Sequence, residues 1–467
     1  MNISTLESGR TALRIQPEVT ALLRALQLGK PDTTFLEKLS EKEWTSLLEF
    51  CNIAHLTLPL AQLPMKKFPY WVVERLRTNL ADNALRFERV KATYREAAEA
   101  LSRAGVEHIV IKGFTQSPDY VLDPRLRRQS DIDIFCPPRS IDAANGALRA
   151  IGYKPSDAKI SYAHADHDAT LVRPGDWQWK NNLFDPEMPL GIELHFCLWN
   201  EHVSHVHVPD TGLFWERRTA REVNGLSFPC LSSVDHLAHL TLHILRNLFL
   251  GDWIVHHVRE LALFLHYRAG DDSFWQTWNE THSPPLRAFE AIVFYYARSW
   301  FDCRLHPLAA HEIDILPAAR RSWLQCFAGS AFEIMFEQNK DFLWLQLSLL
   351  STCREKLKIL RRTLIPGHIL PINSPFIWMR NKRLLKSGDS PVWRQYISYL
   401  ISRSAAHCRV NISTLTRGLC WGLAPLSTRY RGSPIAVPRN HTAEGLLPQE
   451  KAIFNRAVKN TSIGEPL

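Results

Sequence analysis

The stretch Ser130-Asp131-Ile132-Asp133-Ile134-Phe135 alternates acidic and apolar side chains, and Pro137-Pro138 ends it. A period of two is that of a β-strand, in which residues i and i+2 share a face. Asp131 and Asp133 should therefore present two carboxylates side by side. Adjacent negative charges repel one another, and a divalent cation such as Mg²⁺ removes that cost when it binds carboxylates together with substrate phosphates. The same alternation also fits an ordinary exposed strand, so the neighbouring segments have to decide.

Two further runs look like strands of the same sheet. His108-Ile109-Val110-Ile111 is β-branched and ends at Lys112-Gly113, which indicates a strand that enters a glycine turn. Ile192-Glu193-Leu194-His195-Phe196 repeats the acidic and apolar alternation and offers a third carboxylate, Glu193. Between them, Ser140 can cap a helix that runs to about Ala150. Three carboxylates on two strands could hold metal ions that activate a hydroxyl and stabilise leaving pyrophosphate.

Helical patterns surround this core on both sides. The clearest helix is expected from about Trp71 to Arg103, with apolar residues at three-to-four spacing. We therefore expect an α+β fold, a small mixed β-sheet with flanking helices embedded in a largely α-helical chain. The expected divisions are a helical region at 1–105, the catalytic core at 106–205, a helical domain at 206–365 that could wall the cleft, and a basic, loosely structured region at 366–467.

The bulk composition is that of a globular protein with a modest basic excess. The 467 residues include 56 lysines and arginines against 47 acidic residues, and basic stretches lie at Arg380 to Lys386 and Arg429 to Arg439. The excess fits either an anionic partner or a merely solvated basic face. The nine cysteines form no CxxC pair, the N-terminus has no secretory pattern, and no run is apolar enough for a membrane span. A cytoplasmic protein is expected.

The strand motifs together resemble a known family. The segments that carry the resemblance are Ile109 to Gly113, Pro124 to Arg127, Ser130 to Ile134, Gly152-Tyr153 and Ile192 to Phe196. They are similar to the poorly characterised bacterial nucleotidyltransferases of the DNA polymerase β superfamily, over about residues 84 to 200. The resemblance implies that Asp131, Asp133 and Glu193 bind Mg²⁺, with Mn²⁺ as a substitute.

The turn after the first strand is a candidate phosphate site. Gly113 would allow the backbone to approach a phosphate, and Lys112, Arg125 or Arg127 could neutralise its charge. Each cation fits a surface or salt-bridge role equally well. His195 could orient a carboxylate or accept a proton from the acceptor, although a hydrogen-bonded structural histidine is the simpler interpretation.

Other histidines cluster in the sequence, but their spacing does not predict metal sites. His164 and His167 lie near Asp166 and Asp168, and His202, His205 and His207 form an HxxHxH cluster. Neither has a recognised ligand spacing, so both segments are expected to be exposed polar loops. A third group, His236, His239 and His243, lies at helical spacing among leucines, which favours a packing helix.

The function that these features predict is transfer of a nucleoside monophosphate from an NTP to an acceptor hydroxyl, with release of pyrophosphate. The acceptor stays open between a small molecule, a protein and RNA. Two rival functions are a catalytically inactive nucleotide-binding or regulatory protein of the same fold, and an RNA-modifying enzyme whose basic C-terminal region grips RNA. The second predicts binding that weakens steeply with salt.

Overall fold

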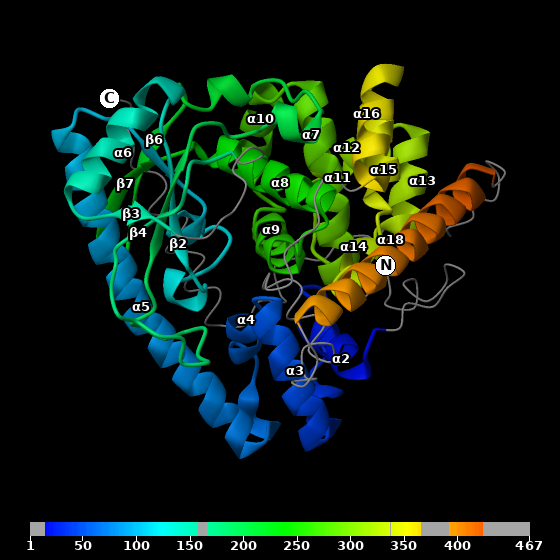
Figure 1. Ribbon diagram of the computed structural model, residues 1–467, viewed down its shortest axis with the longest axis horizontal. Coiled ribbons are helices and arrows are strands. Elements are labelled where there is room, and N and C mark those ends of the chain that lie inside the picture. The colour runs from blue at the N-terminus through cyan, green and yellow to red at the C-terminus, as the bar shows by residue number, and fades with distance from the viewer. Residues whose placement is uncertain (1–14, 157–165, 337, 366–391, 424–467) are drawn as a thin grey trace. The chain divides into compact units, whose positions relative to one another are not determined.

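Strand β2 (Asp131–Phe135) lies at the centre of a mixed sheet in the computed structural model, which describes residues 15–156, 166–336, 338–365 and 392–423 (Figure 1). Within these residues the sheet has seven strands in the order β3-β4-β5-β2-β1-β7-β6. β2 pairs antiparallel with β1 and parallel with β5. The other strands are β1 (Ile109–Ile111), β3 (Lys154–Pro155), β4 (Leu171–Val172), β5 (Gly191–His195), β6 (Thr219–Val223) and β7 (Leu226–Cys230).

The three strands expected from the sequence are confirmed, and so is the α+β class. The hairpin of β6 and β7 was not anticipated. It turns at Asn224-Gly225, where both residues have positive φ, and it joins the sheet through the parallel pairing of β7 with β1. The sheet thus extends past residue 205, the end expected for the core.

One face of the sheet is covered by the long helix α5 (Tyr70–Arg103) and by α6 (Ile141–Ala150). Ile132 and Ile192 point to this face and are fully buried, because the alternation that exposes the acidic residues sends their apolar neighbours to the other side. Each such burial contributes roughly 1.5–3 kcal/mol. The helix expected from Trp71 to Arg103 is confirmed. Ser140 precedes α6, but its side chain makes no capping hydrogen bond.

The opposite face packs against α8 (Ser233–Leu250) and a larger helical layer. Ile109, Ile111 and Phe135 share one apolar core with this helix. The Ser232 side chain caps α8, and Gly251 ends it in the left-handed conformation with φ 72°. The remaining helices are α9 (Val255–Tyr267), α10 (Asp272–Thr281), α11 (Pro284–Phe301), α12 (Pro307–Asp314), α13 (Ala318–Phe327), α14 (Ser330–Glu333), α15 (Phe342–Leu349) and α16 (Cys353–Leu364).

The two ends of the described chain are also helical. Before α5 come α2 (Pro17–Ala25), α3 (Glu41–Ile53) and α4 (Thr57–Ala61), and a short α7 (Glu201–Ser204) follows β5. A loosely structured region was expected from residue 366 onward, but α18 (Val392–Leu423) is a helix of 32 residues. The basic stretches Arg380 to Lys386 and Arg429 to Arg439 lie outside the described residues, as does His164.

The described residues all belong to one compact unit. The boundaries at 105, 205 and 365 therefore stay predictions about folding regions within that unit. No helix among the described residues combines the length and the apolar character that crossing a membrane would need.

Candidate functional site

The register between β2 and β5 gathers the acidic residues on one face of the sheet. Asp131 pairs with Gly191, Asp133 with Glu193, and Phe135 with His195. Residues that are partners across a ladder point to the same side, so both aspartates, Glu193 and His195 face α8. Gly191 has no side chain, and the Thr170 side chain occupies that position, since a Cβ on Gly191 would lie 2.7 Å from Thr170 Cγ2.

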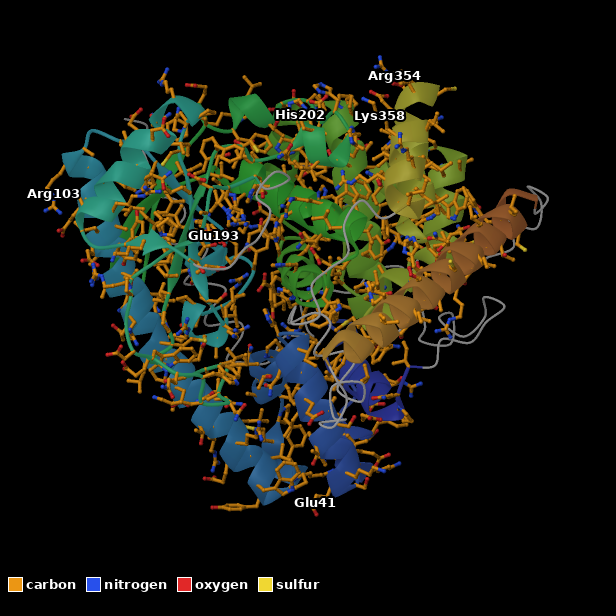
Figure 2. All side chains as sticks on the ribbon, in the orientation of Figure 1. Glu41, Arg103, Glu193, His202, Arg354 and Lys358 are labelled. Carbon is orange, nitrogen blue, oxygen red and sulfur yellow. The ribbon has the colours of Figure 1, made fainter. Side chains whose placement is uncertain are left out.

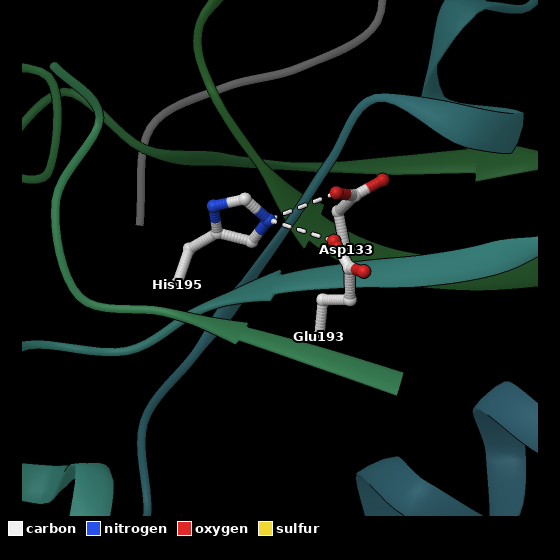
Figure 3. Close-up of side chains that lie close together, drawn as sticks. All are labelled: Asp133, Glu193 and His195. Carbon is white, nitrogen blue, oxygen red and sulfur yellow. Dashed lines mark hydrogen bonds and ion pairs between the residues drawn. The ribbon is translucent and has the colours of Figure 1, made fainter. Parts of the chain in front are cut away.

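His195 joins the carboxylates of the two strands. Its Nε2 lies 2.9 Å from Asp133 Oδ1 and 3.9 Å from Glu193 Oε2, and its ring is buried (Figure 3). One ligand atom from each of Asp133, Glu193 and His195 lies within 4.8 Å of the others. Among the described residues this is the only group of three or more such side chains that could hold a metal ion.

Lys112 approaches the same carboxylate from the turn after β1. Its Nζ lies 2.7 Å from Asp133 Oδ1, so this oxygen carries both the ammonium and the imidazole. The turn places Lys112 at φ 58° and Gly113 at φ 54°. A Cβ on Gly113 would lie 2.5 Å from Gln129 Nε2, which donates to the carbonyl of Asp131. Glycine is therefore required for both the backbone conformation and the approach of Gln129.

The two aspartates of β2 have opposite pKa shifts. Burial, then the neighbouring Asp133 and Glu193 carboxylates, raise the pKa of Asp131 to about 7. Burial also acts to raise the pKa of Asp133, but the Lys112 ammonium and the hydrogen bond from His195 outweigh it and hold that pKa below its ordinary value. The negative charge of Asp133 is thus balanced by contacts with Lys112 and His195, whereas the carboxylate of Asp131 has no such contact.

This asymmetry fits a divalent cation. Among the described residues, no side chain donates a hydrogen bond or forms an ion pair with the Asp131 carboxylate, and only Oδ1 of Asp133 is engaged. Carboxylate oxygens are the preferred ligands of Mg²⁺, and a cation here would relieve the repulsion that raises the pKa of Asp131. The donor set of Asp131, Asp133 and Glu193 therefore suits the expected metal.

A second row of side chains contacts His195 and Glu193 and holds them in place. Asp166 is buried, its Oδ1 accepts a hydrogen bond from Arg246 Nη2 at 2.8 Å, and its Oδ2 lies 4.0 Å from His195 Nδ1. His167 Nε2 lies 3.6 Å from Glu193 Oε2, and Thr170 Oγ1 donates to Glu193 Oε1 at 2.9 Å. The segment of Asp166 and His167 was expected to be an exposed loop, and that was wrong. His167 instead forms an isolated antiparallel β-bridge with His195 of β5.

The two arginines expected near phosphate have carboxylate partners of their own. Arg125 is largely exposed and forms an ion pair with Asp123. Arg127 Nε lies 2.8 Å from Glu260 Oε1 on α9, and both side chains are mostly buried. The structure therefore brings Lys112 and Gly113 to the carboxylates, but it engages Arg125 and Arg127 elsewhere.

The histidine clusters have structural surroundings. His236 and His239 are buried on α8, as a packing helix predicts. His207 is exposed and lies 3.0 Å from Glu201 Oε2. Neither group supplies a metal-binding set among the described residues.

A model of an uncharacterised nucleotidyltransferase family matches residues 40–302, which is more than half of the 467 residues. The chain belongs to this uncharacterised nucleotidyltransferase family. The matched segment runs from the N-cap of α3 to the end of α11, so it contains the sheet, the carboxylates and the helices that face them. It is wider than the segment whose motifs carry the resemblance. Neither the curated proteins nor the solved structures include a match to the chain.

The C-terminal helices lie beyond the segment that this nucleotidyltransferase family model matches. Helices α12 to α16 and α18 follow the matched segment. Sequence reasoning missed Asp166, His167 and Arg246 as neighbours of the site. For Asp166 and His167, the only signal was the abundance of acidic and imidazole side chains between β2 and β5, which does not distinguish a site from a polar loop. Arg246 had no signal of its own in the apolar pattern of α8.

Proposed function

We propose that the protein is an Mg²⁺-dependent nucleotidyltransferase that joins an acceptor hydroxyl to the α-phosphorus of an NTP and releases pyrophosphate. The observation that carries the proposal is the pairing of Asp133 with Glu193 across parallel strands, with Asp131 and His195 on the same face. Membership of a nucleotidyltransferase family supports the reaction class.

The metal would be held by Asp131, Asp133 and Glu193, with Mn²⁺ as a substitute. When bound, such a cation supplies charge stabilisation for the α-phosphate and the leaving pyrophosphate. Among the described residues no cation forms an ion pair with Asp131, although Lys112 and Arg127 lie close enough to act on its pKa. The absence of an ion pair supports a role as metal ligand rather than as a salt-bridge partner.

The protein groups then have separate tasks. Glu193 accepts the proton of the acceptor hydroxyl, whose oxygen forms a bond to the α-phosphorus as the bond to the pyrophosphate oxygen breaks. His195 orients Asp133 through its 2.9 Å hydrogen bond, and Thr170 orients Glu193. Both contacts hold the carboxylates in place before substrate arrives, which is the condition for electrostatic catalysis.

The turn after β1 is proposed as the phosphate contact. Gly113 permits close backbone approach, and Lys112 supplies a positive charge next to the carboxylates. Arg125 is exposed enough to reach the outer phosphates, whereas we assign Arg127, which forms an ion pair with Glu260, to the packing between the sheet and α9.

The location that we propose is the cytoplasm. All nine cysteines are free thiols, which is typical of proteins in a reducing compartment.

The test is metal-dependent NTP binding and pyrophosphate release, measured with each of the four NTPs and an acceptor panel that includes the protein itself. We expect Asp131→Asn and Asp133→Asn to lower release by at least roughly 10²-fold, because each removes charge stabilisation of the transition state. Asp176→Asn is the matched control, since Asp176 is exposed and lies outside the site. NTP binding that needs neither metal nor aspartate would contradict the proposed site. Binding that needs both, without release from any acceptor, would favour the regulatory alternative.

A further inference from the structure

A pocket lies beside α8, where Arg246, the arginine that binds Asp166, forms part of its lining. Its volume is about 40 Å³, and it is formed by residues of α7, α8, α15 and α16. Two of its lining residues are the cations Arg246 and Arg362, and none is acidic. Val203, Phe249 and Ile359 give it apolar walls. We call it the Arg246–Arg362 pocket.

Arg362 is a cation without a carboxylate partner. Its Nη1 donates to the carbonyl of Val203 at 2.6 Å, which is a neutral acceptor, and among the described residues it forms no ion pair. Arg362 is exposed, so water solvates its guanidinium. An exposed guanidinium that is not held in an ion pair can donate charge-assisted hydrogen bonds to an anionic partner.

Arg246 connects the pocket to the carboxylate cluster. Its Nη2 donates to Asp166 Oδ1, and Asp166 Oδ2 lies 4.0 Å from His195 Nδ1, while His195 holds Asp133. The Nε of Arg246 is buried and has no hydrogen-bond partner. Nε–H and Nη2 lie on the same edge of a guanidinium, so this edge faces Asp166, and the charge of Arg246 is already paired with that carboxylate. Arg246 therefore links the pocket to the site, and Arg362 is the lining cation that is not part of an ion pair among the described residues.

The surroundings strengthen the positive potential. Figure 2 shows Arg354 and Lys358 on α16 near His202 on α7. Burial, and then the charges of Arg362 and Lys358, lower the pKa of His205, while Glu355 on α16 acts in the opposite direction. The lining of the pocket itself contains two arginines and no acidic residue, and a cleft lined by one sign of charge concentrates ligands of the opposite sign.

We propose that the Arg246–Arg362 pocket binds a phosphate or carboxylate group of the acceptor, which is therefore a small anionic molecule with an apolar part. This inference rests on the proposed function, because it deepens the same reaction by naming the acceptor class. Gln346, Ile359 and Arg362 come from helices beyond residue 302, outside the segment that the family model matches. The pocket thus combines residues inside the matched segment with residues that follow it, as a wall that selects the acceptor would.

The test uses the full chain and three probes of similar size: phenyl phosphate, benzoate and uncharged benzyl alcohol. Binding is measured by ligand-detected NMR and by calorimetry. We expect at least one of the two anions to bind and the alcohol not to bind, and the preferred anion distinguishes phosphate from carboxylate. Arg362→Gln should weaken that binding roughly 10- to 100-fold, since a charge-assisted hydrogen bond is lost. Absence of binding by both anions would overturn the proposal.

The chain offers a matched control on the same helix. Arg361 is exposed and does not line the pocket, so Arg361→Gln removes the same charge and should leave anion binding unchanged. Thr363→Trp fills the pocket without removing a charge and should abolish binding, with circular dichroism to check that the variant is folded. Equal weakening by Arg361→Gln and Arg362→Gln would reduce the effect to general surface charge and overturn the pocket assignment.

Addition of ATP with Mg²⁺ separates this inference from the proposed function. We expect ATP to bind wild type and Arg362→Gln equally, and not to displace the anion. Displacement in wild type would make the pocket a nucleotide phosphate site and overturn the acceptor assignment. Anion binding that depends on Arg362, in a protein that binds no NTP, would overturn the transferase proposal while leaving an anion site.

Discussion

Glu193 lies directly opposite Asp133 across the parallel strands β2 and β5, while His195, two residue pairs further along, also contacts Asp133. Parallel pairing is decisive here, because it fixes which acidic residues share a face and a level in the sheet. A shift of one residue would send Glu193 into the apolar layer under α5 and α6. The carboxylate cluster is thus a product of strand register.

The first prediction separates the two aspartates in the metal-free protein. Asp131→Asn should raise the metal-free melting temperature by about 2 °C, because it removes a carboxylate that is repelled by its neighbours. Asp133→Asn should lower it, since Lys112 and His195 lose the negative charge of the oxygen that they contact. Both should abolish the additional stabilisation by Mg²⁺ with ATP. Differential scanning calorimetry checks this, and a lower melting temperature for Asp131→Asn would contradict the assigned asymmetry.

A second prediction concerns the protonation of His195. Burial, followed by the Lys112 charge, lowers the pKa of this imidazole, and its Nε2 faces Asp133. We expect a neutral ring with the proton on Nε2 at pH 7, which ¹⁵N NMR of the side chain can observe directly. His195→Gln should retain part of the pyrophosphate release, and His195→Phe should lose roughly tenfold more, because only glutamine can still donate a hydrogen bond. Equal rates for the two variants would remove the positioning role.

A third prediction uses two glycines with different environments. Gly113→Ala should destabilise the fold by about 1–3 kcal/mol, because its φ is positive and the new methyl group would meet Gln129. Gly146 lies within α6 with open space around it, so Gly146→Ala should stabilise by up to about 1 kcal/mol. Urea unfolding of both variants checks the difference. Equal effects would show that the turn does not need glycine.

The strands that carry the carboxylates could be predicted because their pattern is local. The alternation in Asp131 to Phe135 and in Ile192 to Phe196 predicts the strands and also which side chains share a face. The structure confirms the strands. The β6–β7 hairpin also had a local signal, Asn224-Gly225, which is typical of a tight hairpin turn. It was missed because Pro229 and the polar residues of β6 obscure the alternation.

The second row of the site could not be predicted, because its contacts are long-range. Asp166 meets Arg246 across 80 positions, and each lies in a segment whose own pattern suggests something else, a polar loop and a packing helix. The Arg127–Glu260 pair likewise spans 133 positions. Only the packing of α8 and α9 against the sheet brings such groups together, and neither composition nor periodicity encodes that docking.

A fourth prediction decides the role of the two arginines after β1. Arg127→Gln should cost about 3 kcal/mol, since it leaves Glu260 charged and buried without its partner. Arg125→Gln should cost less than about 1 kcal/mol, because its pair with Asp123 is largely solvent-exposed. Urea unfolding gives both values, and ATP titration of the folded variants shows which arginine reaches phosphate. An Arg127→Gln protein of full stability but weakened ATP binding would reverse the assignment.

The last prediction is a loss of stability at alkaline pH that is caused by His282, which is not part of the candidate site. His282 is buried, with Nδ1 3.0 Å from Glu290 Oε2 and Nε2 3.6 Å from Asp235 Oδ1. Burial acts to lower the pKa of His282, but the two carboxylates outweigh it and raise that pKa to about 9.

Because the folded protein holds this proton more tightly than the unfolded chain, the contribution is fully present below about pH 6.5 and is lost as pH rises through about 9. The difference corresponds to at most about 3 kcal/mol. Urea unfolding between pH 6 and 9.5 should therefore show a decline in wild type that is much smaller in His282→Gln, a variant already less stable at pH 6. His207→Gln is the control, because His207 is exposed and should leave the decline unchanged. A His282→Gln protein with the same pH dependence as wild type would show that the imidazolium does not link the two carboxylates.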